Sequence, residues 1–493
     1  MIERDLAMAT TAAPGDTPGN AADCNAVHSA SKIPLRADQV PCRHAGPRTA
    51  ITVGTSWLRG ATRTLYDLIA EEHLRRSVVA MLDQAVVSLA AFATVAILGR
   101  VAGQAELGRY YLPFTILLFA VNIQGELVTS AYAVYRQRRG GKELRQYSGS
   151  VVVFEGISLI LGAVVFFGCW LVSSWTSGPD SLRECFLLLI VAGPLWQLRA
   201  FCRYYAFANL QFATPLIMDA VTTVVQIGIL ILLARSSQLT ASTTYIALAV
   251  ACAVGVATWV SVGRPVIEVR TERLWTDWKE NWAFSRWALA SQVIGCTTPY
   301  VIPWLVANGL GQAEAGTYAA CVNLCGIATM FVLGIAHSLT PHAARAYATG
   351  GLDRLRRVLV RSATAFAFGL GCYCLIMFLV GEPLMGLLYG PRFTETQWVL
   401  NLLALATLAN SMAIVAGNGI WALDCPRANL WGDLVTLVVT VGAAIMLLPV
   451  AGLLGVAGAV LLGNALGAAT RVTVLAMLWK KVRPAPCGSP ALS

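Results

Sequence analysis

Charge is scarce in this sequence. Only 13 % of its 493 residues are Asp, Glu, Lys or Arg, whereas 57 % are hydrophobic. A soluble domain carries about 25 % charged residues. Together with the mean hydropathy of +0.64, this scarcity excludes a soluble globular protein and predicts a chain that places most of its surface in a membrane.

Familiar catalytic and metal-binding motifs are missing as well. The sequence has no Walker loop, no HExxH and no GxSxG pattern, so neither ATP hydrolysis nor a familiar hydrolase is indicated. Its thirteen cysteines are scattered, and none forms a CxxC pair or a ligand-spaced cluster with histidine. We therefore expect no enzyme activity, no metal and no cofactor. We interpret the cysteines as unreactive apolar residues that pack in the core.

Long apolar runs, by contrast, are abundant. Crossing a bilayer as a helix takes roughly 20 apolar residues. We predict twelve such spans, six in each half of the chain, at residues 77–99, 110–134, 149–174, 184–207, 212–235, 242–263, 284–308, 317–339, 361–381, 394–417, 431–450 and 455–478. The expected fold class is an all-α polytopic membrane protein.

The sequence repeats itself. The octet at residues 103–110, GQAELGRY, returns 208 residues later as GQAEAGTY, with six of the eight positions identical. Residues 219–228 match residues 433–442 in the same way, at an offset of 214 residues. An even number of spans separates equivalent positions, so the two six-helix repeats are parallel. We expect a pseudo-twofold axis along the membrane normal and a central cleft between the halves.

The basic residues predict the orientation, because they resist translocation. Of the 36 Lys and Arg residues, the loops after odd-numbered spans hold only five, whereas most loops after even-numbered spans are rich in them, as at residues 136–145, 264–279 and 345–361. Both termini are therefore expected in the cytoplasm. The formal charge of +10 reflects this sidedness together with attraction to anionic lipids, and does not indicate nucleic acid.

These features divide the chain into five parts. Residues 1–76 are expected to form a cytoplasmic, mostly disordered extension without a signal peptide. An N-lobe at residues 77–263 holds spans one to six, and a C-lobe at residues 284–480 holds spans seven to twelve. Between them, residues 264–283 carry Trp275, Trp278 and Trp282 at helical spacing, which predicts an amphipathic linker helix. Residues 481–493 form a cytoplasmic tail.

Three segments carry a family resemblance. Residues 97–110, ILGRVAGQAELGRY, resemble the end of the first span in polysaccharide flippases of the multidrug/oligosaccharidyl-lipid/polysaccharide (MOP) exporter superfamily. Residues 447–459, LLPVAGLLGVAGA, are similar to that family's turn between its last two spans. Residues 348–357, ATGGLDRLRR, are similar to its loop after the eighth span. The resemblance covers about residues 75–480 and implies a MOP/MATE-like fold.

The resemblance also implies a function. It points to transport of an undecaprenyl-pyrophosphate-linked oligosaccharide across the bacterial inner membrane by alternating access, for lipopolysaccharide or exopolysaccharide biosynthesis. The partners implied are membrane lipids and other polysaccharide-assembly proteins. A MATE-like drug/cation antiporter of the same superfamily is the alternative. A glycosyltransferase or polymerase is disfavoured, because the outside loops are too short to hold catalytic groups.

Polar side chains inside the spans are the candidate substrate site. An ionisable residue costs roughly 2.5–3.5 kcal/mol at the centre of a membrane helix on insertion scales, so such residues tend to face a cleft. Asp83 and Gln84 lie in the first span, and Gln84 aligns with Gln292 in the seventh. We predict that these three residues border the cleft. For the two glutamines, hydrogen bonding between helices is the alternative.

The second span adds Asn122 and Glu126, one turn apart on the same helix face. Glu126 has two interpretations that the sequence leaves open. It is either the group that links transport to a coupling ion, H⁺ or Na⁺, or a neutral carboxyl hydrogen-bonded to a neighbouring helix.

Four further residues are candidates. Arg199 and Arg203, one turn apart in the fourth span, either bind the pyrophosphate or extend to the membrane surface. Pro299 and Pro303 in the seventh span are hinge candidates, because each removes a backbone donor. Asp219 and Asp433 also align between the repeats, but a carboxylate near a helix N-terminus is stabilising by itself. We therefore assign those two a structural role.

The predicted topology can be tested with reporter fusions. Fusions after Tyr147 and Arg357 should report a cytoplasmic location, and fusions after Ser177 and Gln312 an extracytoplasmic one. An extracytoplasmic signal from the Arg357 fusion would contradict the orientation.

Overall fold

The computed structural model describes residues 55–175, 180–263 and 267–481. The chain divides into a unit of residues 1–68 and a compact unit of residues 69–493. The predicted extension up to residue 54, and the tail from residue 482, lie outside the described residues. All contacts discussed below belong to the unit of residues 69–493.

The first half of the chain crosses the membrane six times. Its helices are long and apolar because the sequence supplies runs with few charges. Their bounds are α1 (Thr55–Ala102), α2 (Gln104–Gln124), η1 (Gly125–Thr129), α3 (Ser130–Arg136), α4 (Gly141–Trp175), α5 (Asp180–Ala208), α6 (Ala213–Arg235) and α7 (Ala241–Gly263). α2, η1 and α3 follow one another without a break and form a single crossing.

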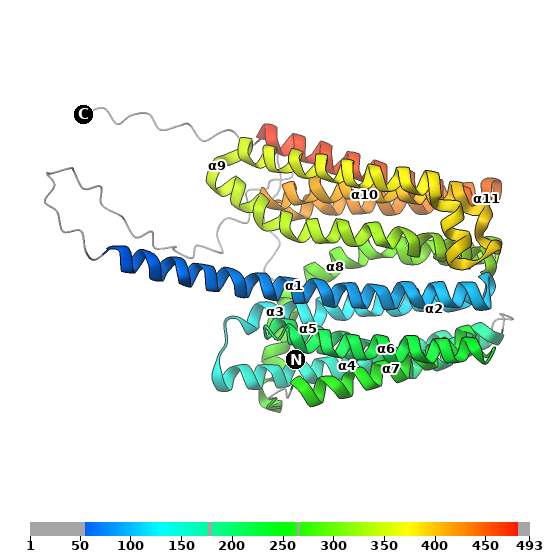
Figure 1. Cartoon of the computed structure of the whole chain (residues 1–493), viewed down its shortest axis with the longest axis horizontal. Helices are drawn as coiled ribbons and strands as arrows, with labels where there is room; N and C mark the ends of the chain where they lie inside the picture. The colour runs from blue at the N-terminus through cyan, green and yellow to red at the C-terminus, as the bar shows by residue number, and fades with distance from the viewer. Residues whose placement is uncertain (1–54, 176–179, 264–266, 482–493) are drawn as a thin grey trace, which may run out of the picture. The chain divides into compact units, whose positions relative to one another are not determined.

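The second half also crosses six times, with fewer separate helices. Its elements are α8 (Thr271–Leu310), α9 (Gln312–Tyr389), η2 (Pro391–Thr396), α10 (Gln397–Ala422), η3 (Pro426–Ala428) and α11 (Asn429–Lys481). The backbone of α9 leaves the helical conformation at Gly350 and Gly351, and that of α11 at Gly452. α9 and α11 therefore each contain two crossing helices (Figure 1).

The predicted fold class is confirmed. Among the described residues, eleven stretches are long and apolar enough to span a membrane, and one of them, Asn429–Lys480, is divided at Gly452. This gives the twelve crossings expected from the sequence. We keep the predicted boundaries, 77–263 and 284–480, as the names N-lobe and C-lobe.

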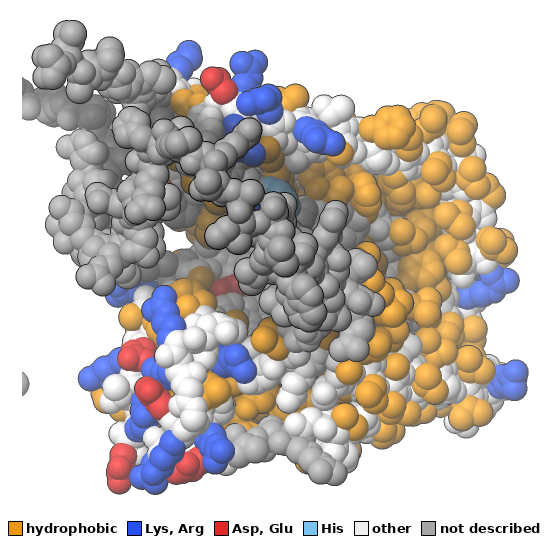
Figure 2. Space-filling view, turned by 60° about the vertical axis from the view of Figure 1, so that its left-hand side comes forward, with side chains coloured by type: hydrophobic (Ala, Val, Ile, Leu, Met, Phe, Trp, Pro, Cys, Tyr) orange, Lys and Arg blue, Asp and Glu red, His pale blue; other side chains and the backbone are white. Residues whose placement is uncertain are grey.

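The two ends of the helices differ. We call the end with the turns at residues 137–140, 209–212 and 350–351 the basic end, and the end with the turns at Gly103, Gly311 and residues 390–396 the opposite end (Figure 1). Figure 2 shows a face on which apolar side chains form a broad band, with most of the charged side chains gathered beyond one side of it. Such a band is the surface that a bilayer covers.

Of the segment predicted as a linker, residues 271–283 belong to α8. This helix runs without interruption from Thr271 into the seventh span. Asp277, Asn281 and Ser285 are fully buried in it, whereas Trp275 and Trp282 are exposed. The polar side of this amphipathic stretch faces the protein, because α4 supplies partners for it. Periodicity alone cannot distinguish such a buried polar face from a solvated one.

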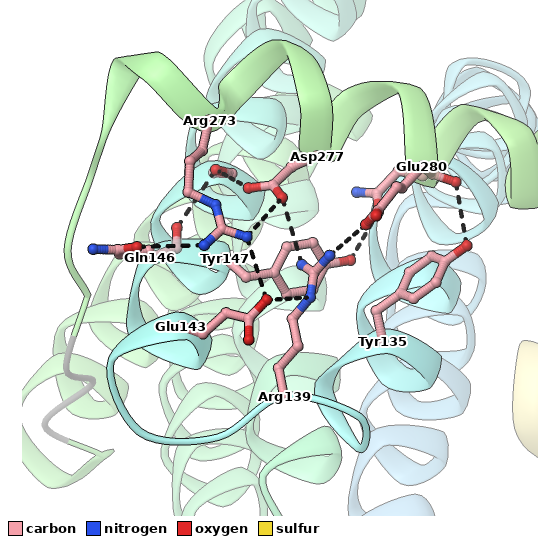
Figure 3. A network of polar contacts seen from close by, with 10 residues as sticks. Tyr135, Arg139, Glu143, Gln146, Tyr147, Arg273, Asp277 and Glu280 are labelled. Carbon is pink, nitrogen blue, oxygen red and sulfur yellow. Dashed lines mark hydrogen bonds and ion pairs between the residues drawn. The ribbon is translucent and has the colours of Figure 1, made fainter.

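A polar network holds the start of α8 against the turn between α3 and α4 (Figure 3). Ser150 donates a hydrogen bond to Asp277 (2.7 Å), and Tyr147 donates one to Asn281 (2.7 Å). The Arg139 guanidinium lies 3.9 Å from the centre of the Tyr147 ring and also pairs with Glu280. This network fixes α8 to the N-lobe before the helix continues as the first helix of the C-lobe.

The extended segment before α8 joins this network. Arg270 and Gln146 donate hydrogen bonds to the Glu268 carboxylate, at 3.0 and 3.4 Å. These bonds hold the pKa of Glu268 below its usual range. Because they favour the charged form, their contribution to stability is present above the ordinary carboxyl pKa and is lost as the pH falls.

Close backbone contact joins the two halves at the opposite end. A Cβ atom on Gly108 of α2 would overlap the carbonyl oxygen of Gln312, and a Cβ atom on Gly316 of α9 would overlap that of Gln104. The contact is reciprocal, and both pairs come from equivalent positions of the repeated octet. A reciprocal contact of this kind is what a local twofold relation produces.

The turns that precede these glycines also match. Gly103 has φ 90° and ψ −178°, and Gly311 has φ 97° and ψ 174°. Residues other than glycine rarely adopt this conformation. The sequence repeat is therefore a repeat of backbone conformation as well.

The hydrophobic core divides along the helices. At the opposite end one core contains side chains from both halves, including Leu107, Leu117, Ile302 and Cys321. Toward the basic end it separates into two clusters. One is built around Tyr147 and Phe201 and their neighbours in the N-lobe, with Trp278 of α8 packed against it. The other lies entirely in the C-lobe.

The glycine contact can be tested by Gly316→Ala. The added methyl group has no space against the Gln104 backbone, so the helices must separate. We expect a loss of about 1–3 kcal/mol, as for overpacked cores, measured as a lower thermal midpoint of the purified protein. Gly326→Ala on the same helix, where a Cβ meets nothing within 4 Å, is the matched control and should be neutral or mildly stabilising. Equal midpoints for the two variants would contradict the tight contact.

Candidate functional site

A buried ion cluster lies inside the N-lobe. Arg203 of α5 donates to Asp83 of α1 (2.6 Å) and pairs with Asp219 of α6 (2.9 Å). Arg199, one turn earlier on α5, pairs with Asp219 (2.7 Å). Gln84 accepts a further hydrogen bond from Arg203 (3.0 Å). The cluster thus contains two carboxylates and two guanidiniums and is neutral as a whole.

Burial decides what this cluster does. Neither Asp83 nor Asp219 has any exposed surface, and Arg199 is 6 % exposed. The structure places Asp83 in the interior of the lobe, not on the wall of a cleft. Likewise, Arg199 is turned toward Asp219 and does not extend to the membrane surface. A charge in a low-dielectric interior requires a partner, and α5 supplies the partners for both carboxylates.

A second polar group bridges the two halves. Gln292 of α8 donates to Asn122 of α2 (3.0 Å), and Asn122 donates to the hydroxyl of Tyr300 on α8 (2.8 Å). Asn122 and Gln292 were predicted from the sequence, and the structure brings them together. Tyr300 was not predicted. Its position two helical turns after Gln292 is the signal that would have identified it.

Glu126 lies in η1, a π-helical turn within the second crossing. Such turns are rare and often mark functional sites. The carboxylate is half-buried and has no hydrogen-bond or ion-pair partner among the described residues. η1 packs against α8, the helix that carries Gln292. Glu126 is therefore a carboxyl group near this junction that has no counter-charge among the described residues.

Another buried carboxyl group lies behind this junction. Gln124 donates to Glu155 of α4 (2.8 Å) and to the backbone carbonyl of Gln197 on α5 (3.0 Å). Glu155 is 1 % exposed. Sequence reasoning did not select Gln124, because it lies two positions from both Asn122 and Glu126 and therefore on another face of the helix.

The C-lobe has its own ion pair. Asp433, the repeat counterpart of Asp219, pairs with Arg471 in the second helix of α11. In the N-lobe the arginine partners come from the helix before the aspartate, whereas in the C-lobe the partner comes from the helix after it. The position of the aspartate is therefore repeated, but the helix that neutralises it is not. Pro299 and Pro303 both lie within α8, and their role as hinges stays a prediction.

No metal site is apparent in the described ranges, since no three His, Cys, Asp or Glu side chains lie close enough together to hold an ion.

Removing one member of the N-lobe cluster should be costly. Asp83→Asn leaves two arginines to share Asp219, so the buried cluster carries one uncompensated positive charge. For this change we expect a loss of about 3–5 kcal/mol, read as a lower thermal midpoint. The double variant Asp83→Asn/Arg203→Gln restores neutrality and should recover part of the loss. A wild-type midpoint for Asp83→Asn would show that the pair contributes nothing.

Comparison with known proteins shows which known fold this chain resembles. No protein-family model matches the chain. Among curated proteins, the probable low-salt glycan biosynthesis flippase Agl15 of Haloferax volcanii is 20 % identical over 182 residues. That match covers 37 % of this chain and 39 % of the relative, so the matched part spans about two fifths of the relative's length.

Solved structures match over most of the chain. The inward-facing conformation of a multidrug resistance MATE family transporter of the MOP superfamily gives a TM-score of 0.69 at 12 % identity, covering 82 % of this chain and 100 % of that one. An outward-facing MATE structure gives 0.59 at 12 % identity, with 83 % and 96 % covered. A MOP superfamily transporter from Pyrococcus furiosus gives 0.60 at 13 % identity, with the same coverage.

At these identities the likeness defines the fold. This chain is a multi-pass membrane protein with the fold of MOP superfamily transporters. The resemblance expected from the sequence is confirmed at that level.

Proposed function

We propose that this protein moves an undecaprenyl-pyrophosphate-linked oligosaccharide from the cytoplasmic to the outer leaflet of the bacterial inner membrane, for cell-surface polysaccharide biosynthesis. In this proposal the basic end and both termini face the cytoplasm, and the lipid tail stays in the bilayer while the head group passes between the lobes. Other polysaccharide-assembly proteins supply and consume the glycolipid. The flippase among the curated relatives, although it matches only part of the chain, supports this substrate class.

The division of the hydrophobic core is the main observation that supports this proposal. One core joins the halves at the opposite end, and two cores serve them separately toward the basic end. A head group from the cytoplasmic leaflet would enter between two separately packed halves. The TM-score is higher with the inward-facing MATE structure (0.69) than with the outward-facing one (0.59). This difference supports a state that is open toward the cytoplasm.

Opening the opposite end would then require the inter-lobe contacts there to separate. These include the packing of the shared core, the glycine crossing, the hydrogen bond from Arg109 to Gln312 (2.8 Å) and the hydrogen bond from Gln104 to the carbonyl of Arg392 (2.6 Å). Each of these hydrogen bonds is of modest net strength. Such contacts can close one end firmly without making its opening prohibitively slow.

The drug/cation antiporter is the second candidate. A cation site needs a carboxylate that is free to bind the cation. In the N-lobe, Asp83 and Asp219 are already neutralised by arginines, whereas the buried Glu155 accepts a hydrogen bond from Gln124. The arginine pairing disfavours a cationic drug at the Asp83–Asp219 cluster. Glu126 is the group we assign to coupling with H⁺ or Na⁺, because it lacks a counter-charge near the junction of the lobes.

Deletion of the gene in its host distinguishes the two candidates. A flippase deletion should abolish surface polysaccharide and cause the lipid-linked oligosaccharide to accumulate in the cytoplasmic leaflet, with drug sensitivity unchanged. The glycolipid can be quantified by mass spectrometry of extracted lipids. Normal surface polysaccharide together with increased drug sensitivity would favour the antiporter.

Glu126→Gln separates coupling from packing. The substitution keeps shape and hydrogen-bonding capacity but removes the ionisable group, so we expect polysaccharide export to fall at least tenfold at normal protein abundance. Glu184→Gln, at an exposed position of α5, is the control for loss of one carboxylate and should export normally. Full export by Glu126→Gln would remove this carboxylate from the mechanism.

A further inference from the structure

The C-lobe encloses a cavity of about 280 Å³ between α8, the first helix of α9, α10 and both helices of α11. Its lining comes from the C-lobe alone, so it is distinct from the junction between the lobes. Pockets for drug-sized ligands measure about 300–1,000 Å³. This cavity therefore has room for one small, ring-sized ligand.

Two asparagine side chains line the cavity without a hydrogen-bond partner in the described part of the chain. They are Asn410 in α10, which is exposed, and Asn464 in the second helix of α11, which is half-buried. Both lie near the middle of a crossing helix. An amide left unpaired there is costly, because the bilayer core supplies no water. The cavity must offer these amides water or a polar ligand.

α8 adds backbone acceptors to the same wall. Pro299 has no N–H group, so the carbonyl of Gly295 one turn earlier lacks its usual helical donor. Both residues line the cavity, and both are exposed. Pro303 removes the donor for the carbonyl of Pro299 in the same way. The proline pair thus supplies acceptors at this wall in addition to its predicted role as a hinge.

The charges of the cavity cancel. Asp433 and Arg471 are paired with each other, and their side chains are 21 % and 13 % exposed. A cation would compete with Arg471 for the carboxylate, and an anion would compete with Asp433 for the guanidinium. The remaining polar lining includes amides and the hydroxyls of Thr298, Thr329, Thr407 and Thr436. This composition favours a neutral ligand that both donates and accepts hydrogen bonds.

The rest of the lining is apolar. It includes Ile302, Val322, Leu403 and Val460, beside the ring of Tyr318. A sugar ring carries hydroxyls around its edge and C–H groups on its faces. A small cavity with unpaired amides and carbonyls on some walls and aliphatic and aromatic groups on others matches both surfaces.

We infer that the C-lobe cavity binds one neutral pyranose ring of the transported head group. Asn410, Asn464 and the Gly295 carbonyl exchange hydrogen bonds with the ring hydroxyls, and the Asp433–Arg471 pair contributes an acceptor and a donor. The identity of the ligand rests on the proposed function, whereas its chemical class rests on the lining of the cavity. The cavity would hold one ring of the oligosaccharide while the lobes change their arrangement.

Thermal titration of the full-length protein in lipid nanodiscs tests the inference. The probes are N-acetylglucosamine, methyl β-D-glucopyranoside and sodium chloride, each added alone. A ligand that binds only the folded state raises the thermal midpoint as its concentration exceeds its Kd. We expect at least one sugar to raise the midpoint, and Asn410→Leu/Asn464→Leu to weaken its apparent affinity at least tenfold.

Asn418→Leu is the matched control. Asn418 lies on the same helix, α10, but accepts a hydrogen bond from Thr340 (2.6 Å) and is not part of the cavity lining. This variant should respond to the sugar like the wild type. If the double variant does not fold, Thr298→Val removes one cavity hydroxyl at nearly constant shape and should weaken the same sugar measurably.

Three results would overturn the inference: no midpoint change with either sugar, an unchanged response in the cavity variants, or a response to sodium chloride alone that the cavity variants lose. The last result would assign a cation site instead. Full polysaccharide export by the double variant would remove the cavity from transport while leaving the proposed function intact. Conversely, normal surface polysaccharide in the gene deletion would overturn the proposed function without affecting sugar binding to the cavity.

Discussion

The crossing of α2 and α9 at Gly108 and Gly316 brings two backbones into contact that any side chain would hold apart. Because each glycine meets the turn residue of the other repeat, the contact sets the angle between the halves at the opposite end. The shared hydrophobic core forms around it. Farther along the helices the halves have separate cores, so the glycine crossing lies at the end where the two halves share one core.

Polar groups inside the helices are arranged under a different constraint. A bilayer cannot solvate them, so each must find a partner in the protein or face a cavity. The N-lobe uses the first solution, since Arg199 and Arg203 neutralise Asp83 and Asp219. The C-lobe uses both, because Asp433 has Arg471 while Asn410 and Asn464 face open space. Duplicated sequences have thus produced lobes with different interiors.

Much of the fold could be predicted from the sequence, because its signals are local. Apolar runs predicted the twelve membrane crossings, and the repeated octet predicted that the two halves are parallel. Partners across helices could not be predicted, since they depend on helix rotation, which hydropathy does not determine. Asp83 was expected at a cleft, but the rotation of α1 directs it to Arg203. The uninterrupted α8 was missed for a related reason: its polar stripe is buried against α4, where a surface helix was expected.

The difference between the lobes bears on which of them can change shape. In the N-lobe, α1, α5 and α6 are tied by one buried ion cluster, and separating any of them would leave a charge unpaired at a cost of several kcal/mol. In the C-lobe, the ion pair joins only the two helices of α11, and the prolines of α8 have already removed two backbone hydrogen bonds beside the cavity. Bending α8 there breaks fewer interactions than moving any helix of the N-lobe cluster. A ligand in the C-lobe cavity would therefore act on the more deformable half, at the helix that also contacts Asn122 of the other half. We therefore expect occupancy of the cavity and the arrangement of the lobes to be linked through α8.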